Sequence, residues 1–207
     1  TGERSLLLDL EGHGREDLFE NVDISRTVGW FTTIFPVLLD IQQVSDAQLG
    51  DVLKAVKEQL RAVPNRGIGY GILRYLCDRT DWQPQPAEVR FNYLGQTDQI
   101  LQSSSIFAPA QEAVGPGRSP QGNRSYRLDI NSVIAAGQLK VDWSYSEAIH
   151  RRATVETLAQ RFIESLRSLI AHCQNPDAGG FTPSDFSEAN LNQQELDQFL
   201  AKLNGIS

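Results

Sequence analysis

Residues 128–145 have the sequence LDINSVIAAGQLKVDWSY, and this stretch decides the fold class of the chain. Two strand-like runs, Leu128–Ile134 and Gln138–Tyr145, lie on either side of Ala135-Ala136-Gly137, which predicts a β-hairpin. An amphipathic helix is predicted over Thr154–Cys173, because its apolar residues repeat at helical spacing along one stripe. A strand pair followed by a long helix is typical of layered α/β proteins.

Three more runs outside this stretch predict strands, over Leu6–Leu10, Thr32–Ile41 and Glu88–Tyr93. The second of them contains Pro36, and proline has no backbone N–H to donate to a sheet ladder. This strand is therefore expected at an edge of the sheet or at a bulge.

Helices are predicted between the strands. The apolar spacing predicts a helix from Ser45 to about Ala62, with Ser45 and Gln48 completing a capping box. Shorter helices are predicted over Ile72–Cys77 and from Gln193 to about Leu203. Residues 96–125 are rich in Gln, Ser, Gly and Pro, and a stretch of this length is either a functional loop or partly mobile. Strands interleaved with helices predict a mixed α/β structure.

Composition excludes several classes of function. The 207 residues carry 26 acidic and 19 basic side chains, which gives a formal charge of −7. This acidic balance argues against a surface that follows nucleic-acid phosphates. No apolar run approaches the roughly 18 residues of a membrane span. The length corresponds to one large domain or to about one and a half small ones.

The two cysteines and the first residues of the sequence indicate a cellular compartment and suggest that the sequence is part of a longer protein. Cys77 and Cys173 lie far apart without metal-ligand spacing, and two buried, reduced thiols in a cytoplasmic protein are predicted in preference to a disulfide. The first residues lack a basic region followed by an apolar one, so no secretory signal is expected in them. A strand-like run begins almost at once and residue 1 is Thr instead of Met, so we expect a piece of a longer protein.

A cluster of polar residues follows the first predicted strand, in the run Glu11-Gly12-His13-Gly14-Arg15-Glu16. A carboxylate, an imidazole and a guanidinium at a strand end are suited to line a pocket, because the glycines let a ligand approach the backbone. The alternative is a solvated turn after an edge strand.

Two other clusters are less specific. Arg66–Gly71 has three alternating glycines, but it follows a helix and lacks phosphate-loop spacing, so close packing at a helix start is the preferred interpretation. Phe91–Gly95 places the amide of Asn92 and the phenol of Tyr93 on opposite faces of a strand, although taken alone an ordinary strand that ends in a glycine turn is the preferred interpretation. No zinc-protease, C-x-x-C, serine-elbow or His-His motif occurs.

These clusters resemble one family when they are taken together. The series resembles the C-terminal half of an epimerization domain of nonribosomal peptide synthetases, within the condensation-domain superfamily. The motifs that carry the resemblance are Glu11–Glu16, Arg26–Thr32, Gly67–Gly71, Phe91–Gly95, Asp142–Ser146 and Thr182–Phe186.

The resemblance implies a fold of two chloramphenicol-acetyltransferase-like α/β lobes, with the active site in the cleft between them. This sequence lacks the His-His motif that the family carries in its N-terminal lobe. We therefore expect residues 1–176 to be the C-terminal lobe alone, and residues 177–207 to be a tail with a short helix that packs on the lobe or links it onward.

The resemblance also implies a reaction at the α-carbon of an aminoacyl or peptidyl thioester. Glu11 and a histidine of the absent lobe would be the two acid/base groups, while Arg15 would orient Glu11 or stabilise the enolate. The family's substrate arrives on the phosphopantetheine of a peptidyl carrier domain, so the N-terminal lobe and that carrier are the expected partners, and no cofactor is expected to bind directly. The expected residues of the substrate channel are His13, Trp30, Asn92 and Tyr93.

Two alternatives also fit the sequence. A condensation domain would form an amide between two carrier-bound substrates, with Glu11 orienting or structural and the upstream histidine performing the chemistry. An isolated lobe would act only as a scaffold or as a docking surface for a carrier. We expect no turnover by these 207 residues alone.

Overall fold

The computed structural model describes residues 2–44, 49–77, 83–98 and 121–204, together with the single residues 112, 115, 117 and 119. The capping box predicted at Ser45 and Gln48, and most of the stretch 96–125, lie outside these residues. Contacts divide the chain into two units, which are described separately. The first unit contains residues 1–6, 38–66 and 160–207, and the second contains residues 7–37 and 67–159.

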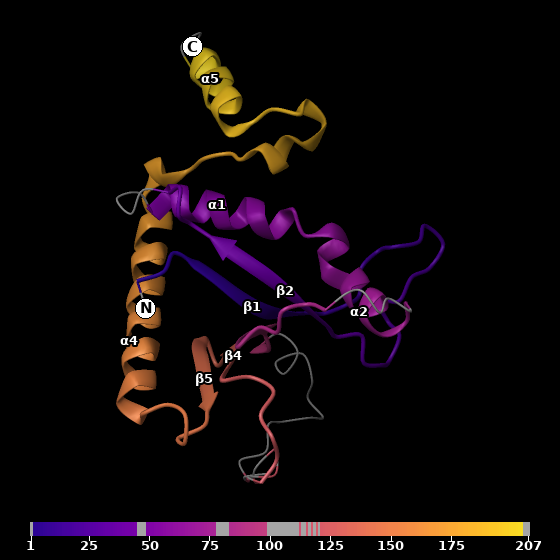
Figure 1. Cartoon of the computed structure of the whole chain (residues 1–207). Helices are drawn as coiled ribbons and strands as arrows, with labels where there is room; N and C mark the ends of the chain where they lie inside the picture. The colour runs from indigo at the N-terminus through magenta and orange to yellow at the C-terminus, as the bar shows by residue number, and fades with distance from the viewer. Residues whose placement is uncertain are drawn as a thin grey trace. The chain divides into compact units, whose positions relative to one another are not determined.

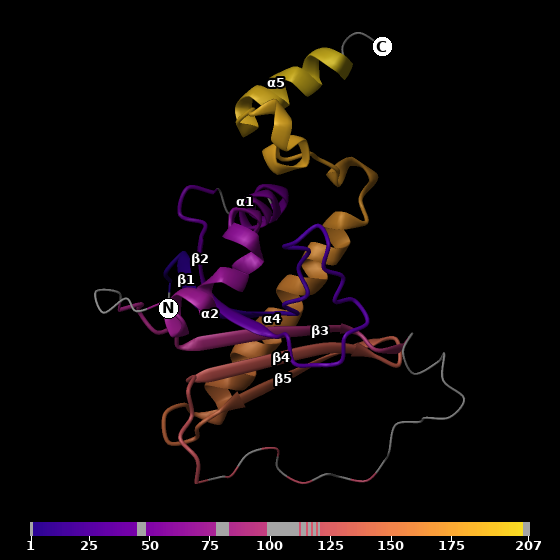
Figure 2. The same ribbon diagram turned by 90° about the vertical axis from the view of Figure 1, so that its right-hand side faces the viewer.

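Five strands form one mixed sheet in the order β2-β1-β3-β4-β5 (Figures 1 and 2). β1 and β4 are both parallel to β3, whereas β5 is antiparallel to β4. The predicted α/β class, the five strands and the hairpin are thereby confirmed, and β2 lies at the edge, as Pro36 predicts. The strand bounds are β1 Ser5–Gly12, β2 Thr33–Asp40, β3 Val89–Gln96, β4 Leu128–Ala135 and β5 Gln138–Tyr145.

The register of the central strands separates an apolar face of the sheet from a polar one. Leu10 is opposite Phe91, and Phe91 is opposite Ile130, so one face is apolar across three strands. Because successive side chains of a strand point to opposite faces, the neighbouring positions form the other face, which is polar. The buried apolar residues of the second unit are Leu8, Phe35, Val37, Ala87, Ile130 and Val155.

The predicted α-helices are present, but α2 has different bounds from those predicted and the short 3-10 helices were not predicted. The helix predicted over Ile72–Cys77 begins four residues earlier, at Ile68, because Gly67 takes a left-handed conformation and caps it. None of the helices in the described part of the chain is long and apolar enough to cross a membrane. The helix bounds are α1 Leu49–Arg61, η1 Pro64–Gly67, α2 Ile68–Tyr75, α4 Arg152–Cys173, η2 Pro176–Ala178, η3 Pro183–Ala189 and α5 Gln193–Asn204.

The prediction that both cysteines are buried is wrong, because both are free and exposed. Cys77 comes two residues after the last residue of α2, and Cys173 is the last residue of α4. Each thiol therefore lies at or just beyond a helix end that the solvent reaches.

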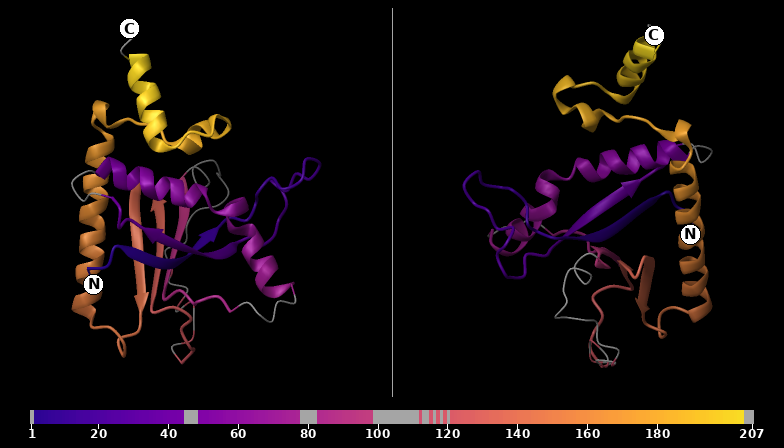
Figure 3. Two further views of the ribbon diagram at one scale, coloured as in Figure 1. Left: turned by 45° about the horizontal axis from the view of Figure 1, so that its top comes forward. Right: turned by 180° about the vertical axis from the view of Figure 1, so that it is seen from behind.

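In the first unit, charged side chains fasten η3 to α1, and Figure 3 shows the two elements next to each other. Asp185 accepts hydrogen bonds from Lys57 Nζ at 2.6 Å and from Arg61 Nη1 at 2.7 Å. The backbone N–H of Thr182 donates to the same carboxylate at 2.9 Å, and Thr182 is buried. The segment after η2 is thus tied to α1 through one carboxylate.

This contact makes the stability of the first unit depend on pH. The hydrogen bond from Lys57, together with those from Thr182 and Arg61, holds the pKa of Asp185 well below its usual range. A lowered pKa in the folded state means that the stabilisation is present above about pH 4 and is lost as the pH falls further. We expect Asp185→Asn to lower the thermal unfolding temperature by roughly 1–3 °C at pH 7, and the difference from wild type to shrink toward pH 3.

Glu188→Gln is the matched control, since Glu188 is an exposed residue of the same 3-10 helix. It should leave the unfolding temperature unchanged at both pH values. A difference between Asp185→Asn and wild type that stays constant from pH 7 to pH 3 would contradict the assignment.

Candidate active site

Glu11 lies near the end of β1 and forms an ion pair with an arginine of the next strand. Its Oε1 atom is 2.8 Å from Nη1 of Arg90, the second residue of β3. The two side chains are only 15% and 12% exposed, respectively, so water screens the pair weakly. The carboxylate of Glu11, a predicted site residue, is therefore held by the guanidinium of Arg90 in the neighbouring strand.

The other edge of the Arg90 guanidinium binds a second carboxylate. Nε donates to Oδ1 of Asp129 at 3.0 Å, and Nη2 donates to Oδ2 at 2.5 Å. Asp129 belongs to β4 and is buried. Two parallel hydrogen bonds of this kind fix the plane of the guanidinium as well as its position.

A tyrosine completes the cluster around Arg90. The ring of Tyr126 lies 5.2 Å from the Cζ atom of Arg90, within the range of a cation–π contact. Its hydroxyl donates to Oδ2 of Asp9 at 2.7 Å, and Asp9 lies on β1 two residues before Glu11. We call Asp9, Glu11, Arg90, Tyr126 and Asp129 the Arg90 cluster.

The strand register explains why these residues meet. Asp9 is opposite Arg90 across β1 and β3, and Arg90 is opposite Asp129 across β3 and β4. Residues in register share a face, and residues two apart on one strand do so too, which places Glu11 on the face of Asp9. The polar face of the sheet is thus a row of charges made by three neighbouring strands.

The charges of the cluster shift the pKa values of its members. Burial alone would lower the pKa of Arg90, but the hydrogen bonds and charge of Asp129 and the charge of Glu11 outweigh it, so the pKa is raised. Burial and the hydrogen bond to Asp9 raise the pKa of Tyr126 well above its ordinary value. At neutral pH Arg90 is therefore a cation, and Tyr126 is a neutral donor to Asp9.

The loop after β1 is held together by Arg15. Its guanidinium donates to the carbonyls of Ile24 at 2.6 Å and Thr27 at 2.8 Å, and it lies 4.2 Å from the centre of the Phe31 ring. Gly14 is buried with a φ of +67°, and a Cβ atom there would lie 1.5 Å from the Phe31 carbonyl oxygen. The motif residues next to Glu11 thus build the loop that follows it.

The other predicted site residues lie in different places. Asn92 is on the face of Arg90, where its amide donates to Oδ1 of Asn131 at 3.3 Å. Tyr93 points to the opposite face and is 52% exposed, while Trp30 is 98% exposed in the loop between β1 and β2. His13 accepts a hydrogen bond from the backbone N–H of Arg15 at 2.9 Å. The structure therefore gathers Glu11 and Asn92 on one face, and places His13, Trp30 and Tyr93 elsewhere.

Sequence reasoning missed most of the Arg90 cluster. The motifs do not include Arg90, Asp129, Tyr126 or Asp9, although all of these except Tyr126 are charged residues inside predicted strands. A charged residue within a predicted strand was the available signal, because a charged side chain that is buried in a sheet needs an ion-pair or hydrogen-bond partner. The partner itself depends on the register between strands, which the sequence does not display.

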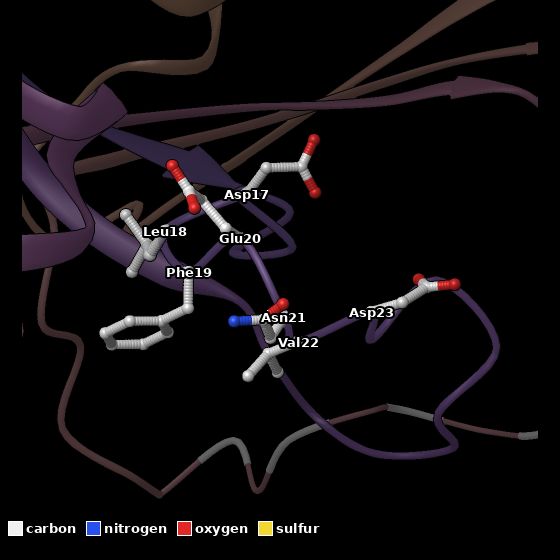
Figure 4. Close-up of a pocket in the computed structure, with 7 residues that line it drawn as sticks. All are labelled: Asp17, Leu18, Phe19, Glu20, Asn21, Val22 and Asp23. Carbon is white, nitrogen blue, oxygen red and sulfur yellow. The ribbon is translucent and has the colours of Figure 1, made fainter.

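A hollow with a volume of about 590 Å³ lies elsewhere in the same loop. Figure 4 shows that its lining residues, Asp17–Asp23, follow one another on a single stretch of chain. None of them belongs to the Arg90 cluster. In the described ranges, no group of three or more His, Cys, Asp or Glu residues is arranged to hold a metal ion.

The sequence matches a family model over most of its length. The model described as "Condensation domain" matches residues 1–192. A linear gramicidin synthase protein of Brevibacillus parabrevis is 51% identical over 211 residues, which cover 100% of this chain and 3% of that protein. Surfactin synthase subunit 2 of Bacillus subtilis (strain 168) is 44% identical over 189 residues, which cover 91% of this chain and 5% of that protein. The chain thus spans a small fraction of these relatives.

Solved structures resemble the fold. The epimerization domain from the third module of tyrocidine synthetase B matches with a TM-score of 0.72 and 35% identity, over 82% of this chain and 38% of that one. A condensation domain structure from the enacyloxin polyketide synthase matches with a TM-score of 0.53 and 14% identity, over 86% of this chain and 34% of that one, which supports the fold alone. These matches confirm the predicted fold class, an α/β structure of the condensation-domain type.

Proposed function

Because this chain belongs to the condensation-domain family, we propose that it is the C-terminal lobe of an epimerization domain in a nonribosomal peptide synthetase. The domain would convert the α-carbon of a carrier-bound aminoacyl or peptidyl thioester from L to D. The observation that carries the proposal is the match to a solved epimerization domain at 35% identity and a TM-score of 0.72.

Epimerisation needs two acid/base groups on opposite sides of the α-carbon. One group removes the α-proton, the electrons of the C–H bond pass into the thioester enolate, and the other group returns a proton to the opposite face. We propose Glu11 as one of these groups and a histidine of the N-terminal lobe as the other. The low exposure of Glu11 supports this role, because few water molecules can then reach the carboxylate and exchange protons with it.

We assign supporting roles to the other predicted residues. Arg15 would hold the loop that follows Glu11, since its guanidinium bonds two loop carbonyls. Asn92, which shares the face of Glu11, would line the path of the substrate and its phosphopantetheine arm beside that carboxylate. Tyr93, His13 and Trp30 would line the path away from this face. The partners would be the N-terminal lobe and a peptidyl carrier domain, so we expect no turnover by residues 1–207 alone.

Condensation is the second candidate, and the family model that matches residues 1–192 favours it. In that case the domain would join two carrier-bound substrates through an amide, and Glu11 would only orient groups around it. The two reactions differ in what they do to mass and to chirality, which makes them separable in one assay.

The deciding experiment uses the full-length synthetase that contains this sequence, with its carrier domain loaded with an L-aminoacyl group. We expect the released acid to be a mixture of D and L forms of unchanged mass, and to gain one deuterium at the α-carbon in D₂O. A product that gains the mass of a second residue and keeps its chirality would overturn the proposal in favour of condensation.

A further inference from the structure

We propose that Arg90 is a positioning residue that aims the carboxylate of Glu11, and that Asp129 and Tyr126 act on Glu11 through Arg90. This inference rests on the proposed acid/base role of Glu11. Arg90 itself is not proposed to touch the substrate, and it would act by setting the position of the Glu11 carboxylate.

The shape of the guanidinium makes the assignment specific. Asp129 occupies the edge formed by Nε and Nη2, with donor–acceptor distances of 3.0 and 2.5 Å. Because the group is planar, fixing one edge fixes the direction of the remaining nitrogen, Nη1. That nitrogen lies 2.8 Å from Oε1 of Glu11. Asp129 therefore orients Arg90, and Arg90 in turn orients Glu11.

The contact engages only one of the two carboxylate oxygens of Glu11. Oε1 faces Arg90, while Oε2 accepts no hydrogen bond among the described residues. A carboxylate that is anchored through one oxygen keeps the other available for a proton. This arrangement suits an acid/base group better than a structural counter-ion, which would bind the guanidinium through both of its oxygens.

Tyr126 closes the cluster into a ring of contacts that starts and ends on β1. Asp9 accepts the hydroxyl of Tyr126 at 2.7 Å, and the ring of Tyr126 lies against Arg90. Arg90 then reaches Glu11, two residues after Asp9 on the same strand. The position of the Glu11 carboxylate is therefore fixed by its contact with Arg90 of β3 as well as by its own rotamer.

The test is a set of variants in the full-length synthetase, assayed for α-proton exchange in D₂O. Arg90→Lys keeps the charge but loses the planar fork, so Asp129 stays compensated and the fold should persist. Arg127→Lys is the matched control, because Arg127 binds Glu88 at 2.9 Å with both side chains more than half exposed. The unfolding temperature of each variant is measured alongside its kcat and KM.

We expect Arg90→Lys to lower kcat about 10- to 100-fold while KM changes less than about threefold, as for a misplaced acid/base group. Asp129→Asn should lower kcat in the same direction, and Arg127→Lys should match wild type. In Arg90→Ala, added methylguanidinium should restore kcat at least about tenfold, which a merely structural role would not produce.

Several results would overturn the inference. These are a wild-type kcat in Arg90→Lys, a loss confined to KM, or a folded Arg90→Ala that methylguanidinium does not restore. If Arg90→Ala does not fold, the comparison of Arg90→Lys with Arg127→Lys decides. If the wild-type synthetase shows no α-proton exchange, the proposed function itself fails. The same variants are then assayed for amide formation, and an unchanged kcat in Arg90→Lys overturns the inference there.

Discussion

Replacement of Glu11 by Gln in the full-length synthetase is expected to lower the rate of α-proton exchange at least about 100-fold. Glutamine keeps the shape of the side chain but cannot accept the proton, and a positioned general base contributes roughly 10²- to 10⁴-fold. The fold should persist, because Arg90 keeps its two hydrogen bonds to Asp129. The measurement is deuterium incorporation at the α-carbon together with the D/L ratio of the released acid.

Glu88→Gln provides the control for this prediction, because its partner Arg127 lies on the surface and outside the Arg90 cluster. It should exchange protons at the wild-type rate. Epimerisation at an unchanged rate in Glu11→Gln would remove Glu11 from the mechanism and leave the histidine of the other lobe to act with some other group.

Gly67→Ala is expected to destabilise the domain by about 2–5 kcal/mol, the sum of a left-handed backbone cost and overpacking. Gly67 has a φ of +82°, and a Cβ atom there would lie 2.1 Å from Cδ1 of Phe35. The Phe35 ring is buried, so it cannot move aside freely. The free energy of unfolding of the complete domain, measured with denaturant, tests this prediction.

The same motif supplies two internal controls. Gly69 and Gly71 lie within α2, and a Cβ atom built at either position would meet no heavy atom of the described residues within 4 Å beyond the adjacent residues and the nearby backbone of the helix. Gly69→Ala and Gly71→Ala should therefore be neutral or stabilise by up to about 1 kcal/mol each, because alanine favours a helix interior. Equal losses at all three positions would show that Gly67 has no special packing role.

The local pattern predicted the elements well because each pattern is a property of neighbouring residues. Strand-like runs predicted β3, β4 and β5, and Pro36 predicted that β2 lies at an edge of the sheet or at a bulge. Close packing was the predicted role of the glycine run, and Gly67 against Phe35 confirms it. The start of α2 was missed because the left-handed cap at Gly67 lets Gly69 and Gly71 enter the helix despite their low propensity.

Burial was predicted less well than secondary structure. Cys77 and Cys173 belong to a residue type that is usually buried, yet both are exposed at helix ends. Residue type gives a preference averaged over many proteins, whereas exposure depends on what the rest of the chain places over a given side chain. Only the arrangement of the elements provides that information.

The sequence by itself predicted the α/β class and an edge or bulge position for β2, and its motifs pointed to Glu11 through a family resemblance, because periodicity, proline and motifs are all read along the chain. Only the tertiary structure decided that Arg90 is the partner of Glu11 and that Asp129 orients Arg90. These residues are separated by 79 and 39 positions in the chain, and they meet through the register of β1, β3 and β4. Alternation assigns each side chain to a face of the sheet. The register between strands decides which residues lie opposite each other, and it follows from the packing of the whole sheet.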